Sequence, residues 1–211
     1  MISLLHFFNK VGELKEIPRK GWVLRGIKNP ETIADHTFRA TLMAWVLGKK
    51  KRLNMERLLK IGLIHDICEV YAGDTTPYDT ILPKDKKKIA ALMKTWPRFT
   101  DAEKRKIAAQ KHKREKKGLE KLVADLPREL RAEIMNLWMD YENGLTPEGR
   151  FFKQADRLEN FLQAIEYWKK YGKLAQKPWW IQARELIDDP VLLDFIKEID
   201  TEFHKTKKPK N

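Results

Sequence analysis

LLKIGLIHDICEVYAGD, residues 58–74, places a histidine and an aspartate side by side within a strongly apolar run. The apolar residues recur at helical spacing, which predicts one amphipathic helix over residues 54–72. Within such a helix His65, Asp66 and Glu69 would share the apolar face, because positions three and four apart lie together. Buried charges are costly unless they are paired or bound to a metal. This stretch therefore predicts a cation site inside a helical core.

Two distant segments offer partners of the same chemistry. His36 lies in ETIADHTFRA (residues 31–40) and Asp156 in FFKQADRLENFLQAIEYW (residues 151–168), and both segments have helical periodicity. Each residue alone has an ordinary explanation, as a hydrogen-bonded core histidine or a solvated aspartate. Together with the histidine and aspartate of the first stretch, they offer two imidazoles and two carboxylates, a plausible ligand set for one divalent metal.

Helical periodicity extends over most of the chain, and no β-type alternation persists. The 211 residues fit one domain. We therefore predict an all-α fold, a compact multi-helix bundle with the metal site in its core, as a single domain over residues 1–205 followed by a short basic tail at 206–211. Outside the first stretch, helices are expected over residues 2–15, 32–47, 130–141, 149–171, 179–186 and 191–204, with one or two more split near Pro97.

The net charge of +13 fits anionic small substrates, nucleic acid or simple solubility. Its densest source, KRKIAAQKHKREKK (residues 104–117), is typical of a solvated helix face and lacks the interleaved aromatic residues that favour single-strand binding. No specific nucleic acid partner is therefore expected. No apolar stretch reaches the roughly 20 residues of a membrane span, and no secretory signal is visible, so we expect a cytoplasmic protein without a membrane partner.

Cys68 is the single cysteine, so the chain cannot form an internal disulfide, which suits a reducing compartment. Its apolar surroundings favour an inert core thiol over a nucleophile. The pair Trp179–Trp180 is expected to be exposed, which favours a homodimer.

Three motifs carry a resemblance to a known family: PRKGWVLRG (residues 18–26), the pattern HDxxExxxGD (residues 65–74), and the segment around Asp156. In these the chain resembles the HD-domain metal-dependent phosphohydrolases, and among them the 5′-deoxynucleotidase subgroup. One departure is the segment 89–112, which looks longer than the usual connection and would form an insertion able to cover the cleft and alter substrate choice.

The resemblance implies an enzyme that removes the phosphate from (deoxy)nucleoside 5′-monophosphates by attack of a metal-bound water. One divalent ion (Mn, Co, Ni, Zn, Fe or Mg) would lower the pKa of that water. Glu69 is then expected to orient or deprotonate the water, and Asp74 to protonate the leaving 5′ oxygen. The implied metal ligands are His36, His65, Asp66 and Asp156.

The resemblance also implies substrate contacts. Arg19 and Arg25 are expected to clamp the phosphate, Trp22 to pack against the sugar or base, and Lys84 to contact the anion. Two alternatives stay open. The chain would otherwise be an HD phosphohydrolase for another ester, such as a nucleoside triphosphate or cyclic nucleotide, or a non-catalytic nucleotide- or RNA-binding protein.

Overall fold

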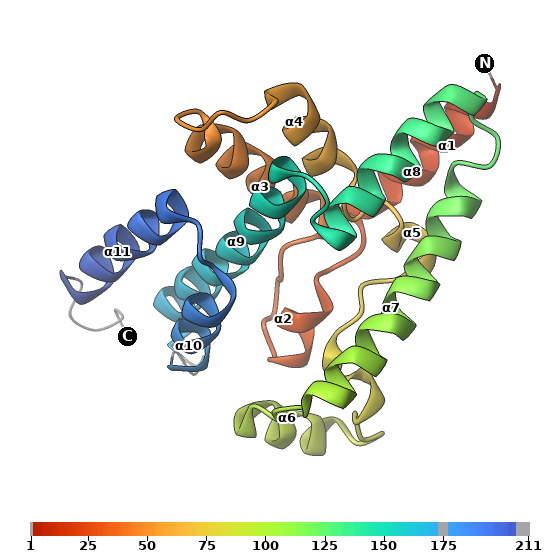
Figure 1. Cartoon of the computed structure of the whole chain (residues 1–211). Coiled ribbons are helices and arrows are strands. Elements are labelled where there is room, and N and C mark those ends of the chain that lie inside the picture. The colour runs from red at the N-terminus through yellow and green to blue at the C-terminus, as the bar shows by residue number, and fades with distance from the viewer. Residues whose placement is uncertain (1, 173–176, 206–211) are drawn as a thin grey trace. The chain divides into compact units, whose positions relative to one another are not determined.

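The computed structural model describes residues 2–172 and 177–205, in which the regular structure is helical apart from one isolated β-bridge between Pro18 and Thr32. The predicted all-α fold is therefore confirmed. The elements, shown in Figure 1, are α1 (Ile2–Gly12), η1 (Glu13–Lys15), α2 (Lys20–Leu24), α3 (Ile33–Gly48), α4 (Met55–Ile64), α5 (Glu69–Ala72), η2 (Pro77–Thr80), α6 (Lys86–Thr95), α7 (Asp101–Leu122), α8 (Arg128–Asn143), α9 (Pro147–Tyr171), α10 (Lys177–Leu186) and α11 (Pro190–Lys205).

These elements form two compact units that interleave along the chain. The first comprises Met1–Asp35 and Ile64–Trp138, and the second His36–Leu63 and Met139–Asn211. The single domain over residues 1–205 stays a prediction, and the predicted tail at 206–211 lies outside the described residues. In the part of the chain that the structure describes, no helix combines the length and apolarity needed to cross a membrane.

In the first unit the short helix α5 packs against the long helix α7 (Figure 1). The close approach requires Gly118, because a Cβ at this position would lie 2.8 Å from the carbonyl oxygen of Cys68. Leu119 and Val123 are fully buried beside it. Since Glu69 begins α5, the packing of α7 positions this carboxylate.

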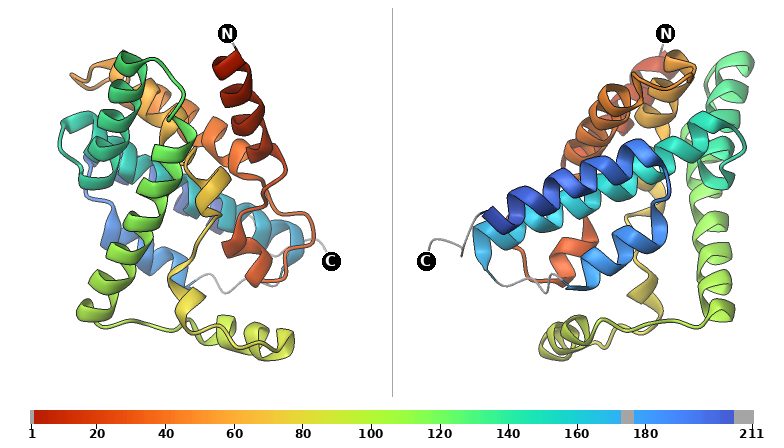
Figure 2. Two further views of the ribbon diagram at one scale, coloured as in Figure 1. Left: turned by 90° about the vertical axis from the view of Figure 1, so that its right-hand side faces the viewer. Right: turned by 60° about the vertical axis from the view of Figure 1, so that its left-hand side comes forward.

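In the second unit α9 is the central helix, and Figure 2 shows α11 lying along it. α10 also packs on α9, where the Trp180 ring meets Phe161 edge to face at a centroid distance of 4.6 Å. Both Trp179 and Trp180 are half-buried, which corrects the expectation that this pair is exposed. The buried face of α9 includes Phe152, Leu158, Phe161 and Ile165.

The predicted continuous helix over residues 54–72 is wrong. α4 ends at Ile64, residues 65–68 form a turn, and α5 begins at Glu69. The amide of Ile67 donates to the carbonyl of Ile64 at 3.3 Å, and that of Glu69 to the carbonyl of Asp66 at 3.0 Å. These i→i−3 bonds tighten the chain into a turn, which apolar spacing alone does not reveal.

The other helical predictions agree to within about two residues at most ends. The region around Pro97 contains two helices, α6 and α7. The first predicted helix, over residues 2–15, divides into α1 and η1. Two further elements, α2 and η2, lie outside the helices that were expected from the sequence.

Candidate functional site

His36 lies on α3 with both ring nitrogens facing carboxylates of α9, in the second unit. Its Nδ1 bonds to the Oε2 atom of Glu159, and its Nε2 lies 3.0 Å from the Oδ1 atom of Asp156. The His36 side chain is completely buried. The pairing follows from helical spacing, because Asp156 and Glu159 are three residues apart and share one face of α9.

Glu159 is itself the centre of an ion-pair network. Arg39, one turn after His36, donates from Nε to Glu159 at 2.8 Å and from Nη1 to Glu166 at 2.7 Å. Burial alone would raise the pKa of Glu159, but the charges and hydrogen bonds of His36 and Arg39 outweigh it and hold this pKa below its usual value. Glu159 is therefore held as a carboxylate that fixes the orientation of the imidazole.

Asp156 is held from two sides. The hydroxyl of Tyr141 donates to its Oδ2 atom at 2.9 Å, and the amide of Asn160 donates to its Oδ1 atom at 3.2 Å. These bonds fix the rotamer of the carboxylate that faces His36, so the two side chains are oriented before any ligand binds.

This donor set fits a divalent cation. When the imidazole is neutral and Nδ1 donates to Glu159, Nε2 presents a lone pair to a carboxylate oxygen of Asp156. Two lone pairs at 3.0 Å repel unless a proton or a metal ion lies between them. A carboxylate behind the distal nitrogen of a histidine is also the usual support of a metal-binding imidazole.

In the first unit, the turn between α4 and α5 carries the second histidine–aspartate pair. His65 and Asp66 are 1% and 8% exposed. The Oδ2 atom of Asp66 lies 3.2 Å from His65 Nε2 and accepts from Arg19 Nη1 at 3.0 Å. The structure thus brings Arg19, a predicted phosphate contact, directly to a predicted metal ligand. A guanidinium at this position can bind anionic oxygens that approach the aspartate.

Glu69 follows on α5 and is only 2% exposed. Burial raises its pKa well above the usual value, the charges of Asp66 and Asp74 raise it further, and Arg19 offsets part of the effect. Among the described residues its Oε2 atom has no hydrogen-bond partner. A buried acceptor without a partner is costly, so this carboxyl group is suited to bind a water or a substrate hydroxyl.

Asp74 connects the loop after α5 to the beginning of α2. Its Oδ2 atom accepts the backbone amide of Lys20 at 2.6 Å, while the ammonium group of Lys20 pairs with Asp79 at 2.7 Å. Gly73 makes the turn possible with a φ of 71°. Asp74 is therefore more than a turn residue, because it satisfies an amide at the start of a helix.

The remaining predicted contacts differ in exposure. Trp22 is 2% exposed and donates its indole N–H to Glu31 at 2.8 Å, which is the environment of a core anchor. Arg25 donates to the carbonyl of Gly21, and its guanidinium lies 4.6 Å from the ring centre of Trp96, within the predicted insertion. Burial lowers the pKa of Arg25 and Tyr78 opposes this effect. Lys84 is exposed in the turn before α6.

Cys68 is 1% exposed. Burial raises the pKa of its thiol well above the usual value, and the charges of Glu115, Asp66 and Glu69 act in the same direction. A thiol that resists ionisation is a poor nucleophile, which favours the inert role expected from the sequence.

Several residues of these clusters were not identified from the sequence: Arg39, Tyr141 and Glu159 around His36, and Lys20 beside Asp74. Helical spacing offered a signal for two of them, since Arg39 follows His36 by three residues and Glu159 follows Asp156 by three. Tyr141 and Lys20 come from distant segments, so spacing offered none.

Comparisons with known proteins agree with these motifs. A profile described as HD domain matches residues 11–178. The human 5′-deoxynucleotidase HDDC2 is 34% identical over 205 residues, covering 95% of this chain and 86% of the relative, and the fission yeast 5′-deoxynucleotidase hdd1 is 29% identical, covering 94% and 89%. A conserved hypothetical protein from Pyrococcus furiosus has a similar structure, with a TM-score of 0.65, 26% identity, and coverage of 96% and 99%. This chain therefore belongs to the HD-domain family.

Proposed function

We propose that this protein is a metal-dependent phosphohydrolase that removes the phosphate from (deoxy)nucleoside 5′-monophosphates. The names of its relatives support the reaction and the substrate class. The observation that carries the proposal furthest is His36 held between Glu159 and Asp156, because a metal ion at Nε2 would relieve the repulsion between the facing lone pairs.

Membership of the HD-domain family implies a divalent metal ion. We propose that His36, His65, Asp66 and Asp156, the ligands that the family resemblance implies, hold this ion. Such a mixture of imidazole and carboxylate suits Mn, Co, Ni, Zn, Fe or Mg. When bound, the ion supplies Lewis acidity to the phosphoryl group and lowers the pKa of water.

The protein's own residues perform the remaining tasks. Arg19, already bonded to Asp66, binds phosphate oxygens and neutralises their charge. Glu69 holds the attacking water with its unpartnered carboxyl oxygen and accepts the water's proton. Asp74 donates a proton to the leaving 5′ oxygen, and the Lys20 amide keeps its carboxyl group oriented.

Substrate specificity is proposed to come from the segment after Pro18. Arg25, supported by Trp96, contributes positive charge to the phosphate end of the substrate. Trp22 shapes the sugar pocket through its packing rather than through an exposed face, because the side chain is buried. Lys84 reaches the anion from the turn before α6.

The test is phosphate release from the four deoxynucleoside and four ribonucleoside 5′-monophosphates by metal-stripped protein, before and after addition of Mn, Co or Mg. The proposal expects no turnover without metal, restored turnover with metal, and loss of at least a thousandfold in Asp66→Ala. Asp194→Asn, an exposed carboxylate of α11, is the matched control and should behave like the wild type. Metal-independent turnover, or turnover that survives in Asp66→Ala, would overturn the proposal.

We also propose that the protein is a cytoplasmic homodimer. A stripe of exposed apolar side chains on α3 supports self-association: Phe38 is 70% exposed, Trp45 47% and Val46 60%. The buried, free Cys68 suits a reducing compartment. Light scattering coupled to size-exclusion chromatography should give twice the chain mass of 25.0 kDa, and Trp45→Lys should lower it. A wild-type mass of one chain would contradict the dimer.

A further inference from the structure

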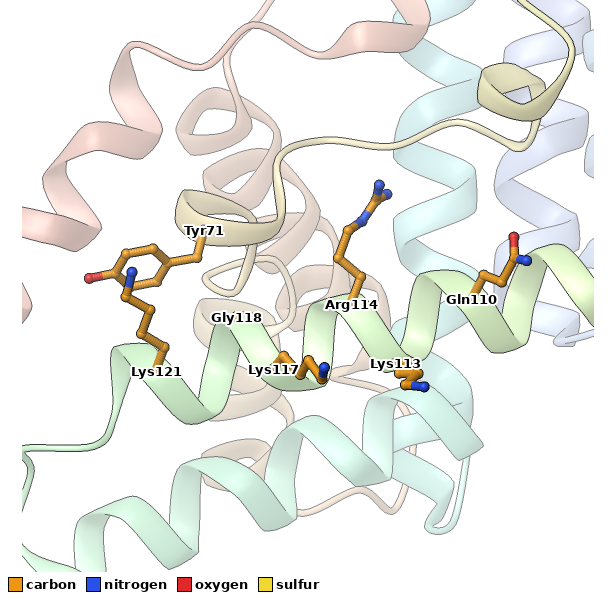
Figure 3. Close-up of a pocket in the computed structure, with 7 residues that line it drawn as sticks. All are labelled: Tyr71, Gln110, Lys113, Arg114, Lys117, Gly118 and Lys121. Carbon is orange, nitrogen blue, oxygen red and sulfur yellow. The ribbon is translucent and has the colours of Figure 1, made fainter.

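A groove on the first unit runs along α7 where α5 meets it. Its volume is about 500 Å³, and its lining residues, drawn in Figure 3, are Tyr71, Gln110, Lys113, Arg114, Lys117, Gly118 and Lys121. Six of the seven belong to α7, and Tyr71 comes from α5. We call this feature the α7 groove. Four of its seven lining residues are Lys or Arg, and none is acidic.

The charge of the α7 groove is not neutralised by its own helix. α7 carries nine Lys and Arg against four Asp and Glu. Asp101 pairs with Lys104, Glu103 caps the helix through Thr100, Glu115 is buried and pairs with Lys111, and Glu120 pairs with Lys116. The acidic side chains of the helix are thereby engaged with groups outside the groove.

The cations of the groove itself remain available. In the described part of the chain, Lys113, Arg114 and Lys117 form no ion pair, and all three are exposed. Like charges gathered along one groove repel one another, which costs stability unless an anion shares the site. This arrangement therefore indicates a ligand that carries several negative charges.

The spacing of the cations distinguishes an extended ligand from a compact one. Lys113, Lys117 and Lys121 are four residues apart, so they succeed one another at about 6 Å along the helix axis. They form a row on one side of the helix and do not converge on one point. A row of evenly spaced cations matches a chain of repeated phosphates better than it matches a single phosphate group.

Tyr71 adds the aromatic group that the basic stretch of sequence lacks. Its ring lies beside the Lys121 end of the row (Figure 3). Lys121 Nζ is 4.2 Å and Lys10 Nζ 4.7 Å from the ring centre. Gly118 lets α5 approach α7 closely, because a Cβ at this position would meet Cys68 and Ala72, the neighbour of Tyr71. An aromatic ring beside a basic track is the combination found in grooves that bind single strands.

From this geometry we propose that the α7 groove binds the phosphodiester backbone of a single-stranded oligonucleotide without sequence preference. The row of cations contacts successive phosphates, and Tyr71 contacts a sugar or base. This differs from the expectation drawn from the sequence, because the aromatic residue comes from another helix. The proposal does not rest on the phosphohydrolase activity, since no proposed catalytic or metal-binding residue lines the groove.

The test is the binding of a fluorescent 12-nucleotide oligo-dT by anisotropy between 50 and 300 mM salt, with EDTA present. The tested variant combines Lys113→Gln, Arg114→Gln, Lys117→Gln and Lys121→Gln. We expect at least tenfold weaker binding and a salt slope smaller by about 2 to 3, because each phosphate that a cation neutralises on a single strand contributes roughly 0.7 to the slope. Asp66→Ala should bind like the wild type while losing turnover, which separates this inference from the proposed enzymatic function.

The matched control removes four equally exposed positive charges elsewhere, in Lys49→Gln, Lys50→Gln, Lys87→Gln and Lys88→Gln. It should keep most of the affinity and the salt slope. Equal losses in both variants would overturn the inference, because net charge would then explain the binding.

Three further probes identify the class of ligand. Tripolyphosphate should compete poorly with the oligonucleotide at equal phosphate concentration, and a 3-nucleotide strand should bind more weakly than the 12-nucleotide strand. Equal competition by tripolyphosphate would overturn the inference in favour of a small polyanion site. Groove-dependent binding to vesicles of phosphatidylserine and phosphatidylcholine, without oligonucleotide binding, would overturn it in favour of a membrane surface.

Discussion

The two histidine clusters are built in opposite ways. Around His36, in the second unit, two regular helices place their side chains in register, and the carboxylates of Asp156 and Glu159 both have hydrogen-bond donors. Around His65, in the first unit, the chain turns between two helices, and Glu69 is buried with an oxygen that lacks a partner among the described residues. The carboxylates of the first cluster have protein donors, whereas Glu69 keeps an oxygen that can accept a hydrogen bond from a bound water or ligand.

The pKa values express this difference. Glu159 has a lowered pKa because its cationic neighbours outweigh its burial, and Glu69 has a raised pKa because burial and neighbouring carboxylates act together. A carboxylate with a lowered pKa is suited to hold a ligand, and a carboxyl group with a raised pKa is suited to exchange a proton. A glutamate therefore orients a histidine in one unit, as Glu159 does, and is proposed to accept a proton in the other, as Glu69 does.

Among the substitutions compared here, Glu69→Gln should cause the largest loss of turnover. The substitution keeps the shape of the side chain but removes the group that accepts a proton, so turnover of deoxynucleoside monophosphates at saturating metal should fall by about 10²–10⁴-fold. Because the native state disfavours the charge of Glu69, the free energy of unfolding of the metal-free protein should not fall. Turnover and urea denaturation, measured on the same preparation, check the expected loss of activity and the expected stability. A variant that unfolds more easily but keeps its turnover would contradict both expectations, and Glu69 would then have a structural role rather than a catalytic one.

Glu159→Gln should affect metal binding. It weakens the partner behind His36 Nδ1 while leaving the ring in place, and the metal affinity should fall by about 10–100-fold. Isothermal titration with Mn measures this affinity. Glu166→Gln is the control, because Glu166 pairs with Arg39 at 2.7 Å and has no bond to His36 among those described. If both variants lost affinity equally, Glu159 would have no special role.

Asp140 offers a satisfied carboxylate outside the proposed metal site. Burial would raise its pKa, but hydrogen bonds from Thr146 and Arg57 outweigh it and lower this pKa. A lowered pKa contributes stability that is complete above the usual value near 3.8 and is lost as the pH falls through the folded-state value. Asp140→Asn should cost about 2 kcal/mol at pH 7 through unsatisfied donors.

The pH dependence makes this prediction specific. Between pH 5 and pH 3, the wild type should lose stability relative to Asp140→Asn, so the difference between the two proteins should shrink. Chemical denaturation at several pH values measures it. A difference that stays constant through this range would mean that Asp140 does not gain its stability from its charge.

Asp74 has two roles that substitutions can separate: it accepts a hydrogen bond from the Lys20 amide, and it is proposed to donate a proton. Asp74→Ala removes the acceptor of the Lys20 amide and should cost about 1 kcal/mol of stability, as for a lost helix cap, whereas Asp74→Asn keeps an acceptor and should cost little. Both variants should lose turnover of nucleotides but less turnover of p-nitrophenyl phosphate, whose leaving group needs no proton. Equal losses on both substrates would remove the proton-donor role.

The helices of this protein could be predicted largely because their apolar faces repeat at the helical period. α9 is the clearest case, since Phe152, Leu158 and Ile165 mark its buried side in the sequence as in the structure. The division of the predicted helix at His65 could not be found in this way, because the turn also places its apolar residues inward: Ile67 and Cys68 are both buried. The spacing of apolar residues indicates which positions are buried, but it does not distinguish a buried turn from a buried helix.

The predicted site residues were found where the residue type is unusual for its surroundings. His36, His65 and Asp66 are ionisable groups in apolar segments, and the structure buries all three. Residues that complete an ion pair across distant segments, such as Lys20 with Asp79, have nothing unusual in their own neighbourhood. Their identification required the fold.

Gly118 has a consequence for the evolution of this protein. A helix of four residues such as α5 cannot persist alone, so the position of Glu69 depends on a contact that only a residue without a side chain permits. The exposed cations of α7 can be exchanged during divergence without moving Glu69. Position 118 cannot drift in the same way, and we expect a selected change at this site to require a second change in the turn that it contacts.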